Sequence, residues 1–355
     1  MTFRKTPPFP APFPDPFMGA IQHSELLLWD SWVMHLDGID HLYCLALARR
    51  NQDGSAITPG QRNDYKFHFR HFESADRGAS WKDKGIALKP GNIADGNDAG
   101  NVWSGGVLPL EDGKVLFGFT GISNDSPDHP FVQSINFAIG PASGPKHFAK
   151  EAASHPVRDR EAIVEMGYYL PSVDRIGHYE GEENGPITAW RDPYFFREAN
   201  GDIYAFWSAK LGPRRPAVAW GKVTIDGTAV SLKLLPPISL PDDKDYTQSE
   251  VPKICKNLVT DTYYMIISAC SRLDEKQSDE DVFKQLRLYK SKSLSGPWEP
   301  YKAGSNILKG MDNLFGASFL DMTVTHDAIQ IVAPYTEKAS PALELTFAPV
   351  KTLKI

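Results

Sequence analysis

Short strand-like runs alternate with turn-forming residues along the whole chain, and this restricts it to an architecture of many short strands. Runs such as HLYCLALA, KVLFGFTG, DIYAFWSA and TYYMIISAC are rich in β-branched and aromatic residues, and each has about the length of one strand. Residues 111–114 and 199–202 have the composition of hairpin turns. The chain is therefore predicted to be all-β, and for 355 residues a propeller competes with a large sandwich or barrel.

Four short motifs favour the propeller. WD at residues 29–30, WSGG at 103–106, RDP at 191–193 and SEVP at 249–252 lie tens of residues apart, each just before or within a strand-like run. The inner strands of a propeller converge on its axis, so polar groups from different blades can meet in one pocket. The motifs thus predict a propeller with a central pocket on its axis.

No clear domain boundary interrupts the pattern. Residues 1–20 are rich in proline and are predicted to run extended over the surface, whereas residues 21–355 are predicted to form a single propeller domain. Helical patterns are scarce, and the best short candidates are residues 159–166 and 274–282. Residues 152–186 resemble an insertion between blades, and residues 236–245 read as a surface loop.

Charge and composition make some classes of binding partner and some locations unexpected. A formal net charge of -6 disfavours nucleic acid and anionic membranes, and no apolar run approaches the roughly 20 residues that span a bilayer. Prolines interrupt the N-terminal segment, so a classical secretory signal is not expected. The expected location is therefore cytoplasmic, although non-classical export is left open. Cys44, Cys255 and Cys270 give neither a disulfide framework nor metal-ligand spacing, and Cys44 and Cys270 are expected to be buried.

Three carboxylic acids stand in contexts that suit sugar chemistry. Glycoside cleavage usually needs one carboxyl that donates a proton and one that is ionised, each in its own environment. Asp30 follows three leucines and lies between Trp29 and Trp32, an unusual setting for an acid and one whose rings suit the apolar face of a sugar. The alternative is an aspartate that caps a turn at the end of a strand.

The other motifs are ambiguous when each is taken alone. Asp192 follows Arg191, which could keep it ionised or bind sugar hydroxyls, but an Arg–Asp pair can also be purely structural. Glu250 could equally be an exposed loop acid. Trp103 and Ser104 could supply a stacking ring and a hydroxyl donor, or belong to a turn with a core tryptophan.

In this order, the four motifs resemble glycoside hydrolase family 68, the levansucrases, inulosucrases and bacterial β-fructofuranosidases. The resemblance is distant and runs from about Trp29 to Tyr335, through WDSWVMHLDGIDHLYCLALARR, HFRHFESADRGASWKDKGIAL, NVWSGGVLPLEDGKVLFGFTG and RDPYFFREANGDIYAFW. It implies a five-bladed β-propeller and a retaining glycosidase or fructosyltransferase that acts on β-fructofuranosyl sugars such as sucrose or short fructooligosaccharides.

The resemblance also implies roles for individual residues. Asp30 would be the nucleophile, Asp192 the stabiliser of the transition state, and Glu250 the general acid and then base. The expected sugar-binding residues are Trp29, Trp103, Ser104, Arg191, Gln248 and Arg272. The mechanism needs no cofactor and no residue is assigned to a metal, although the family analogy leaves room for a structural calcium with unknown ligands.

Several positions depart from the family pattern. Val33 replaces the usual proline, Val251 replaces the arginine that normally follows the acid, and Phe315 replaces a tyrosine. These departures fall mainly on the leaving-group side and leave the donor open. Two other functions therefore stay in view: an inverting, arabinanase-like propeller glycosidase, and a sugar-binding propeller without activity. The sequence decides neither the acceptor nor the oligomeric state.

Overall fold

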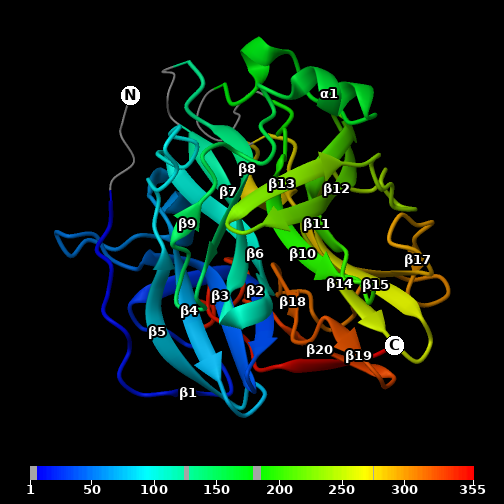
Figure 1. The fold of residues 1–355 in the computed structure, drawn as a ribbon. Helices are drawn as coiled ribbons and strands as arrows, with labels where there is room; N and C mark the ends of the chain where they lie inside the picture. Colours follow the sequence, from blue (N-terminus) through cyan, green and yellow to red (C-terminus); the bar gives the residue numbers. More distant parts are fainter. Residues whose placement is uncertain (1–5, 124–127, 179–184, 275) are drawn as a thin grey trace.

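The computed structural model describes residues 6–123, 128–178, 185–274 and 276–355, which form a five-bladed β-propeller. Its five sheets follow one another around the molecule in chain order, from the blue first blade to the orange and red fifth (Figure 1). The prediction of an all-β propeller is therefore confirmed. The sandwich and barrel alternatives are excluded because the described strands form five separate small sheets, not two large facing sheets or one closed sheet.

Each blade is a mostly antiparallel sheet, and the strands nearest the axis are β2, β6, β10, β14 and β18. The first blade has the order β1-β5-β4-β3-β2, from β1 (Phe17–Met18), β2 (Leu26–Leu36), β3 (Ile39–Ala48), β4 (His68–Ser74) and β5 (Ser80–Leu88). The second contains β6 (Asn101–Pro109), β7 (Val115–Ser123), β8 (Val132–Gly140) and β9 (His147–Phe148). The third contains β10 (Arg191–Arg197), β11 (Ile203–Gly212), β12 (Arg215–Asp226) and β13 (Ala229–Leu234).

The last two blades are less regular. The fourth consists of β14 (Gln248–Asn257), β15 (Thr262–Cys270), β16 (Lys284–Ser291), β17 (Glu299–Pro300) and β19 (Thr323–Val324), which pairs in parallel with β14. The fifth has only β18 (Ser318–Phe319), β20 (Ala328–Val332) and β21 (Lys351–Lys354) within the described residues. The helical elements are α1 (Arg160–Glu165) and the 3-10 turns η1 (Pro59–Asp64), η2 (Glu111–Gly113), η3 (Val173–Arg175) and η5 (Asp279–Asp281).

The two ends of the chain close the ring. Ile21 forms an isolated bridge with Phe347, and Phe347 forms another with Pro334 beside the fifth blade. The backbone N–H of Leu28 donates to the carbonyl of Leu345 at 2.8 Å. The incomplete fifth blade is therefore joined to the first by main-chain hydrogen bonds, which keep β2 in a fixed place at the axis.

The proline-rich segment crosses the outer side of the first blade, where Figure 1 shows it in dark blue beside β5. The Arg70 guanidinium donates to the carbonyls of Pro10 and Ala11, both at 2.8 Å. The amide of Phe13 donates to the Asp83 carboxylate at 2.8 Å, and Asp83 forms a buried ion pair with Arg70 at 2.5 Å. Residues 6–16 contain no helix or strand, and residues 1–5 lie outside the described part.

The hydrophobic core is divided into layers between neighbouring blades. Phe69 of the first blade packs edge-on against Phe119 of the second, and Phe137 of the second packs against Phe195 of the third. Further clusters fill the spaces between the third and fourth, fourth and fifth, and fifth and first blades. This arrangement holds the five inner strands at the axis, where the site lies.

The connections mostly agree with the sequence predictions. Residues 111–114 and 199–202 join β6 to β7 and β10 to β11, and α1 falls within the predicted helix at 159–166. Residues 152–186 do connect the second and third blades, with residues 179–184 outside the described part. The predicted helix at 274–282 is wrong: only η5 forms there, and residue 275 is not described.

Local hydrogen bonds explain the missing helix. The Gln277 side chain accepts from the backbone N–H of Leu273 at 2.8 Å, and its carbonyl accepts from the Arg272 guanidinium at 2.6 Å. Side-chain bonds of this kind offer the backbone an alternative to helical hydrogen bonding. Elsewhere, Cys44, Cys255 and Cys270 are free and buried, as expected for Cys44 and Cys270. Among the described residues, no helix has the length and apolar character needed to cross a bilayer.

Candidate active site

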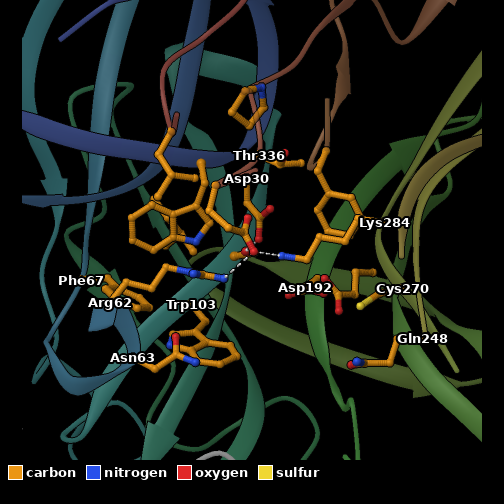
Figure 2. Close-up of a pocket in the computed structure, with 18 of the residues that line it drawn as sticks. Asp30, Arg62, Asn63, Phe67, Trp103, Asp192, Gln248, Cys270, Lys284 and Thr336 are labelled. Carbon is orange, nitrogen blue, oxygen red and sulfur yellow. Dashed lines mark hydrogen bonds and ion pairs between the residues drawn. The ribbon is translucent and has the colours of Figure 1, made fainter. Parts of the chain in front are cut away.

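A single pocket near the propeller axis brings the predicted site residues together. Figure 2 shows part of its lining, with Asp30, Trp103, Asp192 and Gln248 around one cavity. Every residue predicted for the site lines this pocket: Trp29, Asp30, Trp103, Ser104, Arg191, Asp192, Gln248, Glu250 and Arg272. Residues up to about 240 positions apart in the sequence are thus neighbours in space, and the strand order explains why.

The inner strands of the first four blades each carry one extra residue at the pocket. The bulges fall at Asp30 in β2, Ser104 in β6, Asp192 and Pro193 in β10, and Val251 and Pro252 in β14. A β-bulge bends its strand and re-aims the neighbouring side chain. The repeated bulge is therefore what turns Asp30, Ser104, Asp192 and Glu250 toward a common cavity.

Three of these bulges hold the backbone in a sparsely populated conformation. Asp30, Asp192 and Val251 have φ values of 26°, 67° and 43°, although none of them is glycine. Such a conformation costs on the order of 1–3 kcal/mol per residue and tends to persist at functional sites. In this propeller the strain coincides with two acids and with the residue that follows the third.

Hydrogen bonds link the inner strands of the first four blades in sequence. The Ser104 hydroxyl donates to Asp30 Oδ2 at 2.5 Å. The Thr120 hydroxyl donates to the carbonyl of Ser104 at 3.0 Å and accepts from the backbone N–H of Asp192 at 2.8 Å. The backbone N–H of Val251 then donates to Asp192 Oδ2 at 3.2 Å. Each carboxylate is therefore positioned by a neighbouring blade.

Gly316, just before β18, completes this ring from the fifth blade. Its carbonyl accepts from the backbone N–H and from the hydroxyl of Ser31, both at 3.0 Å. Its own N–H donates to the Ser268 hydroxyl of the fourth blade at 2.8 Å. The short fifth blade is thus tied to the residue that follows Asp30.

Burial dominates the electrostatics of the two aspartates. It raises the pKa of Asp30, and the nearby charge of Glu250 adds to this rise. The hydrogen bond from Ser104 favours the carboxylate form and lowers the pKa of Asp30 in part. Burial also raises the pKa of Asp192 to about 7, against the lowering effect of the Arg191 charge.

Lys253 supplies a buried positive charge to this group of acids. It lies on β14, three residues after Glu250, and is fully buried, with its Nζ 5.2 Å from the centre of the Tyr194 ring. Within the described part of the chain, its Nζ has no hydrogen-bond partner. Its charge lowers the pKa of Asp30, while burial lowers the pKa of Lys253 itself to about 8. Lys253 was not predicted, because a lysine in the run KICKN reads as a solvent-facing strand residue.

Arg191 is the main connector on the other side of the pocket. Its guanidinium donates to Gln248 Oε1 at 2.5 Å and to Glu250 Oε1 at 3.2 Å. It also forms an ion pair with Asp192 at 3.7 Å and lies 5.5 Å from the centre of the Trp103 ring. Because arginine keeps its charge at all relevant pH values, it holds these groups in one arrangement.

An aromatic wall closes one side of the pocket. Trp29 packs edge-on against Phe67 with ring centres 4.7 Å apart, and Phe67 stacks against Trp103 at 6.1 Å. Trp29 and Trp103 are only partly buried, so their surfaces reach the cavity. Partly exposed rings beside carboxylates suit a ligand with apolar and hydroxylated faces.

A cluster of charged side chains at the pocket, Arg62, Lys284 and Glu337, was not predicted from the sequence. Arg62 and Lys284, both labelled in Figure 2, form ion pairs with the Glu337 carboxylate, which is 3.8 Å from Arg62. The two cations lower the pKa of Glu337 to about 2. The three residues come from η1, from the start of β16 and from a loop after β20, so no local motif marks them.

Two of the residues that depart from the family pattern, Val251 and Phe315, lie at or beside the pocket. Val251 is buried and donates its backbone N–H to Asp192. It therefore supplies no charged side chain where the family has arginine. Phe315 lines the pocket, and Lys284 Nζ lies 5.5 Å from the centre of its ring. Arg272, one of the expected sugar-binding residues, lines the pocket while its guanidinium donates to the Gln277 carbonyl at 2.6 Å.

No calcium site can be assigned on side-chain grounds. In the described part of the chain, one group of three His, Cys, Asp or Glu side chains brings its ligand atoms together, namely His41, His71 and Glu73. Calcium prefers six to eight oxygen ligands, so two imidazoles do not suit it. The calcium allowed by the family analogy therefore enters no step below.

Comparison with known proteins gives a match in three dimensions only. No protein-family model matches the sequence, and no curated protein matches it either. Bacillus subtilis levansucrase superposes with a TM-score of 0.63 at 16% identity, covering 94% of this chain and 84% of the other. A variant levansucrase in complex with sucrose gives 0.62 at 16% identity, with 94% and 84% covered. A B. megaterium levansucrase variant gives 0.63 at 16%, with 93% and 83% covered.

These identities are low, so the likeness concerns the fold. Nearly the whole chain takes part in it, and so do more than four fifths of each levansucrase compared. The protein described here has the levansucrase fold.

Proposed function

We propose that this protein is a retaining glycosidase or transglycosidase that acts on β-D-fructofuranosyl sugars. The observation that carries the proposal is the meeting of Asp30, Asp192 and Glu250, from three different blades, at one pocket lined by tryptophans. A levansucrase of the same fold has been solved with sucrose bound, and another with oligosaccharides bound. Fold alone does not set an activity, so the proposal rests on the chemistry of the pocket.

In the first step, an Asp30 carboxylate oxygen attacks the anomeric carbon of the fructosyl unit. The bond from that carbon to the glycosidic oxygen breaks, and Glu250 donates its proton to the departing oxygen. The product is a fructosyl ester on Asp30, with Glu250 left as a carboxylate. The Ser104 hydroxyl, 2.5 Å from Asp30 Oδ2, orients the attacking group.

In the second step, Glu250 takes a proton from water or from a sugar hydroxyl. The resulting oxygen attacks the anomeric carbon, and the ester bond to Asp30 breaks. Free fructose or a longer sugar leaves, and both carboxyl groups return to their starting forms. The choice between hydrolysis and transfer depends on which acceptor occupies the outer part of the pocket.

Differences in exposure support this division of roles. The Asp192 side chain is 4% exposed and receives the backbone N–H of Val251, which suits a fixed acceptor for sugar hydroxyls. The Glu250 side chain is 17% exposed, which suits a group that must exchange protons with acceptors. Arg191 contacts both and keeps them at the same cavity.

The charged residues around the departing group bear on which donor sugar the protein accepts. Val251 offers no charged side chain there, while Arg62, Lys284 and Glu337 bring charged groups to the lining from other loops. The two-step reaction can use sucrose or short fructooligosaccharides as donors. Because Val251 replaces the family's arginine, the donor is best identified by testing several of these sugars.

The test is incubation with sucrose, 1-kestose, inulin and arabinan, with release of free fructose, glucose and arabinose measured over time. Release of fructose from at least one donor supports the proposal. Release of arabinose alone would favour the arabinanase-like reaction, in which the carboxyl groups stand further apart. Saturable sugar binding with no product after long incubation would favour a binding propeller without activity. An Asp30→Asn variant serves as the control for contaminating activity.

A further inference from the structure

Two histidines and a glutamate converge on one face of the first blade, away from the pocket. His41 on β3 pairs directly with Glu73 on β4, and Tyr43 pairs with His71. Side chains two residues apart in a strand point to the same face, so these four form a square on that face. His41 pairs with Met34 on β2, and Met34 lies four residues after Asp30 in that strand. The cluster is therefore roughly 13 Å along the strand from Asp30.

The three potential ligand atoms form a compact triangle. His41 Nδ1 lies 3.0 Å from His71 Nε2 and 3.7 Å from Glu73 Oε1, and His71 Nε2 lies 4.0 Å from the same oxygen. Ligands bound to zinc at about 2.0–2.2 Å in a tetrahedron stand roughly 3.4 Å apart. The three separations bracket that value, so a cation could sit between the atoms after small side-chain rotations.

The surrounding contacts hold the ligands ready. The His71 ring stacks on Tyr43 with centres 4.5 Å apart and planes 7° apart, and the Tyr43 hydroxyl donates to the carbonyl of Ala142 at 2.5 Å. Lys84 Nζ binds Glu73 Oε2 at 2.9 Å, which leaves Oε1 facing the two imidazoles. Oriented ligands of this kind are typical of metal sites in proteins.

One of the three side chains opens the triangle to solvent. The Glu73 side chain is 28% exposed, which gives solvent a route to the triangle. An entering ion can therefore keep water as its remaining ligands.

We propose that His41, His71 and Glu73 bind a first-row divalent transition cation of the Zn²⁺ type. Imidazole nitrogen and carboxylate oxygen together suit such ions, whereas Ca²⁺ and Mg²⁺ prefer oxygen alone. Without the ion, one of the two facing nitrogens carries a hydrogen that it shares with the other. On binding, that proton moves to the other nitrogen of the same ring, and both facing lone pairs turn to the metal.

The bound cation would stabilise the first blade rather than take part in the reaction. It would join β3 to β4 by bonds additional to the backbone ladder, and none of its three ligands lines the pocket. Ions that bind the folded state alone raise its stability. The site therefore predicts a gain in thermal stability with no change in turnover, whatever reaction the pocket performs.

The test uses the full-length protein after treatment with a chelator and removal of that chelator. Titration with Zn²⁺ should give about one equivalent bound per chain and a higher Tm, and Co²⁺ in its place should give visible absorption bands of a low-coordinate site. His41→Gln and Glu73→Gln should each lose the stoichiometric binding and the rise in Tm. His147→Gln, which removes an exposed imidazole, is the matched control and should bind as the wild type does.

Two results would overturn the proposal. One is binding of clearly less than one equivalent of Zn²⁺ by the wild type; this outcome does not depend on any variant. The other is unchanged binding in both His41→Gln and Glu73→Gln when far-UV circular dichroism shows them folded. Ca²⁺ serves as the negative arm, since a rise in Tm with Ca²⁺ that both variants abolish would contradict the proposed ligand chemistry.

Discussion

Gly316 leaves no room for a side chain against Asp30: a Cβ built on Gly316 would lie 2.4 Å from Asp30 Oδ1 and 2.7 Å from Asp30 Cα. Gly316 also has a φ of 61°, a conformation that favours glycine. The fifth blade therefore sets the position of the proposed nucleophile by close backbone contact.

Gly316→Ala should displace the Asp30 carboxylate and reduce kcat by on the order of 100-fold, since misplacement by about 1 Å has this effect. Gly310→Ala is the matched control, because Gly310 has a φ of 77° and a Cβ added there would meet nothing within 4 Å. Both variants carry the same type of backbone strain. Equal kcat values for the two, measured with the best donor, would disprove the positional effect.

Asp30→Asn should lower turnover on the order of 10⁴-fold or more, because the amide cannot form the ester intermediate. Donor binding should change little, since the side chains have nearly the same shape. Asp37→Asn provides the control: Asp37 is exposed in the hairpin after β2 and also has a positive φ, of 50°. Steady-state kinetics and isothermal titration with the donor separate the two effects, and near-normal turnover in Asp30→Asn would remove the assignment.

The acid limb of the pH profile should lie above the usual range for aspartate. Burial raises the pKa of Asp30 and raises that of Asp192 to about 7, so falling pH protonates these carboxylates earlier than it would a free side chain. Since the reaction needs Asp30 ionised, kcat/KM should begin to fall with decreasing pH already above the usual range of aspartate. An acid limb centred near pH 4 would show that the burial of these groups has no such effect.

Lys253→Met should move that acid limb to still higher pH. The positive charge of Lys253 lowers the pKa of Asp30, so its removal leaves the carboxylate easier to protonate. The fold should survive, because the buried Nζ has no hydrogen-bond partner among the described residues and methionine has a similar volume. Lys256→Met is the control on the same strand; its Nζ binds Tyr263 at 2.8 Å and Asp261 at 2.9 Å instead. Coincident profiles for the two variants would refute the electrostatic role.

Arg191→Lys should reduce kcat/KM by roughly 10–100-fold while preserving the charge. Arg191 Nη2 contacts both Gln248 and Glu250 while its Nη1 donates to Gln133 at 3.2 Å, and a lysine cannot reproduce this forked geometry. Arg197→Lys is a suitable comparison, since Arg197 lies on the same strand and donates to the carbonyl of Pro109 at 2.8 Å. If both variants retain wild-type kcat/KM, charge alone is sufficient at position 191.

Much of the architecture was predictable because its signals are local. Strand-like runs and turn residues mark the blades, and the motifs around Asp30, Asp192 and Glu250 each occur on an inner strand. The positions of these motifs near the start of the inner strands bring them to one end of the axis. The sequence pattern therefore predicted which acids lie in the site. The direction of their side chains depends on bulges, which form through pairing with the next strand.

Other features depend on register and on distant loops. Gly316 matters only because β18 meets β2 at Asp30, and Lys253 is buried only because β14 carries a bulge just before it. The pairing of His41 with Glu73 follows from the alignment of β3 with β4, which no local pattern states. The predicted helix at 274–282 failed for a similar reason, since side-chain bonds within the β15–β16 connection compete with helical ones.

The most direct measurement of the central claim is the stereochemistry of transfer to methanol, with sucrose or 1-kestose as donor and NMR detection of the product. Attack by Asp30 followed by attack of methanol inverts the anomeric carbon twice, so the proposed mechanism predicts methyl β-D-fructofuranoside, formed by the wild type and absent with Asp30→Asn. Formation of the α-anomer would contradict the nucleophilic role of Asp30. Absence of any fructosyl product with both donors, at protein concentrations where the sugars bind, would contradict the proposed chemistry itself.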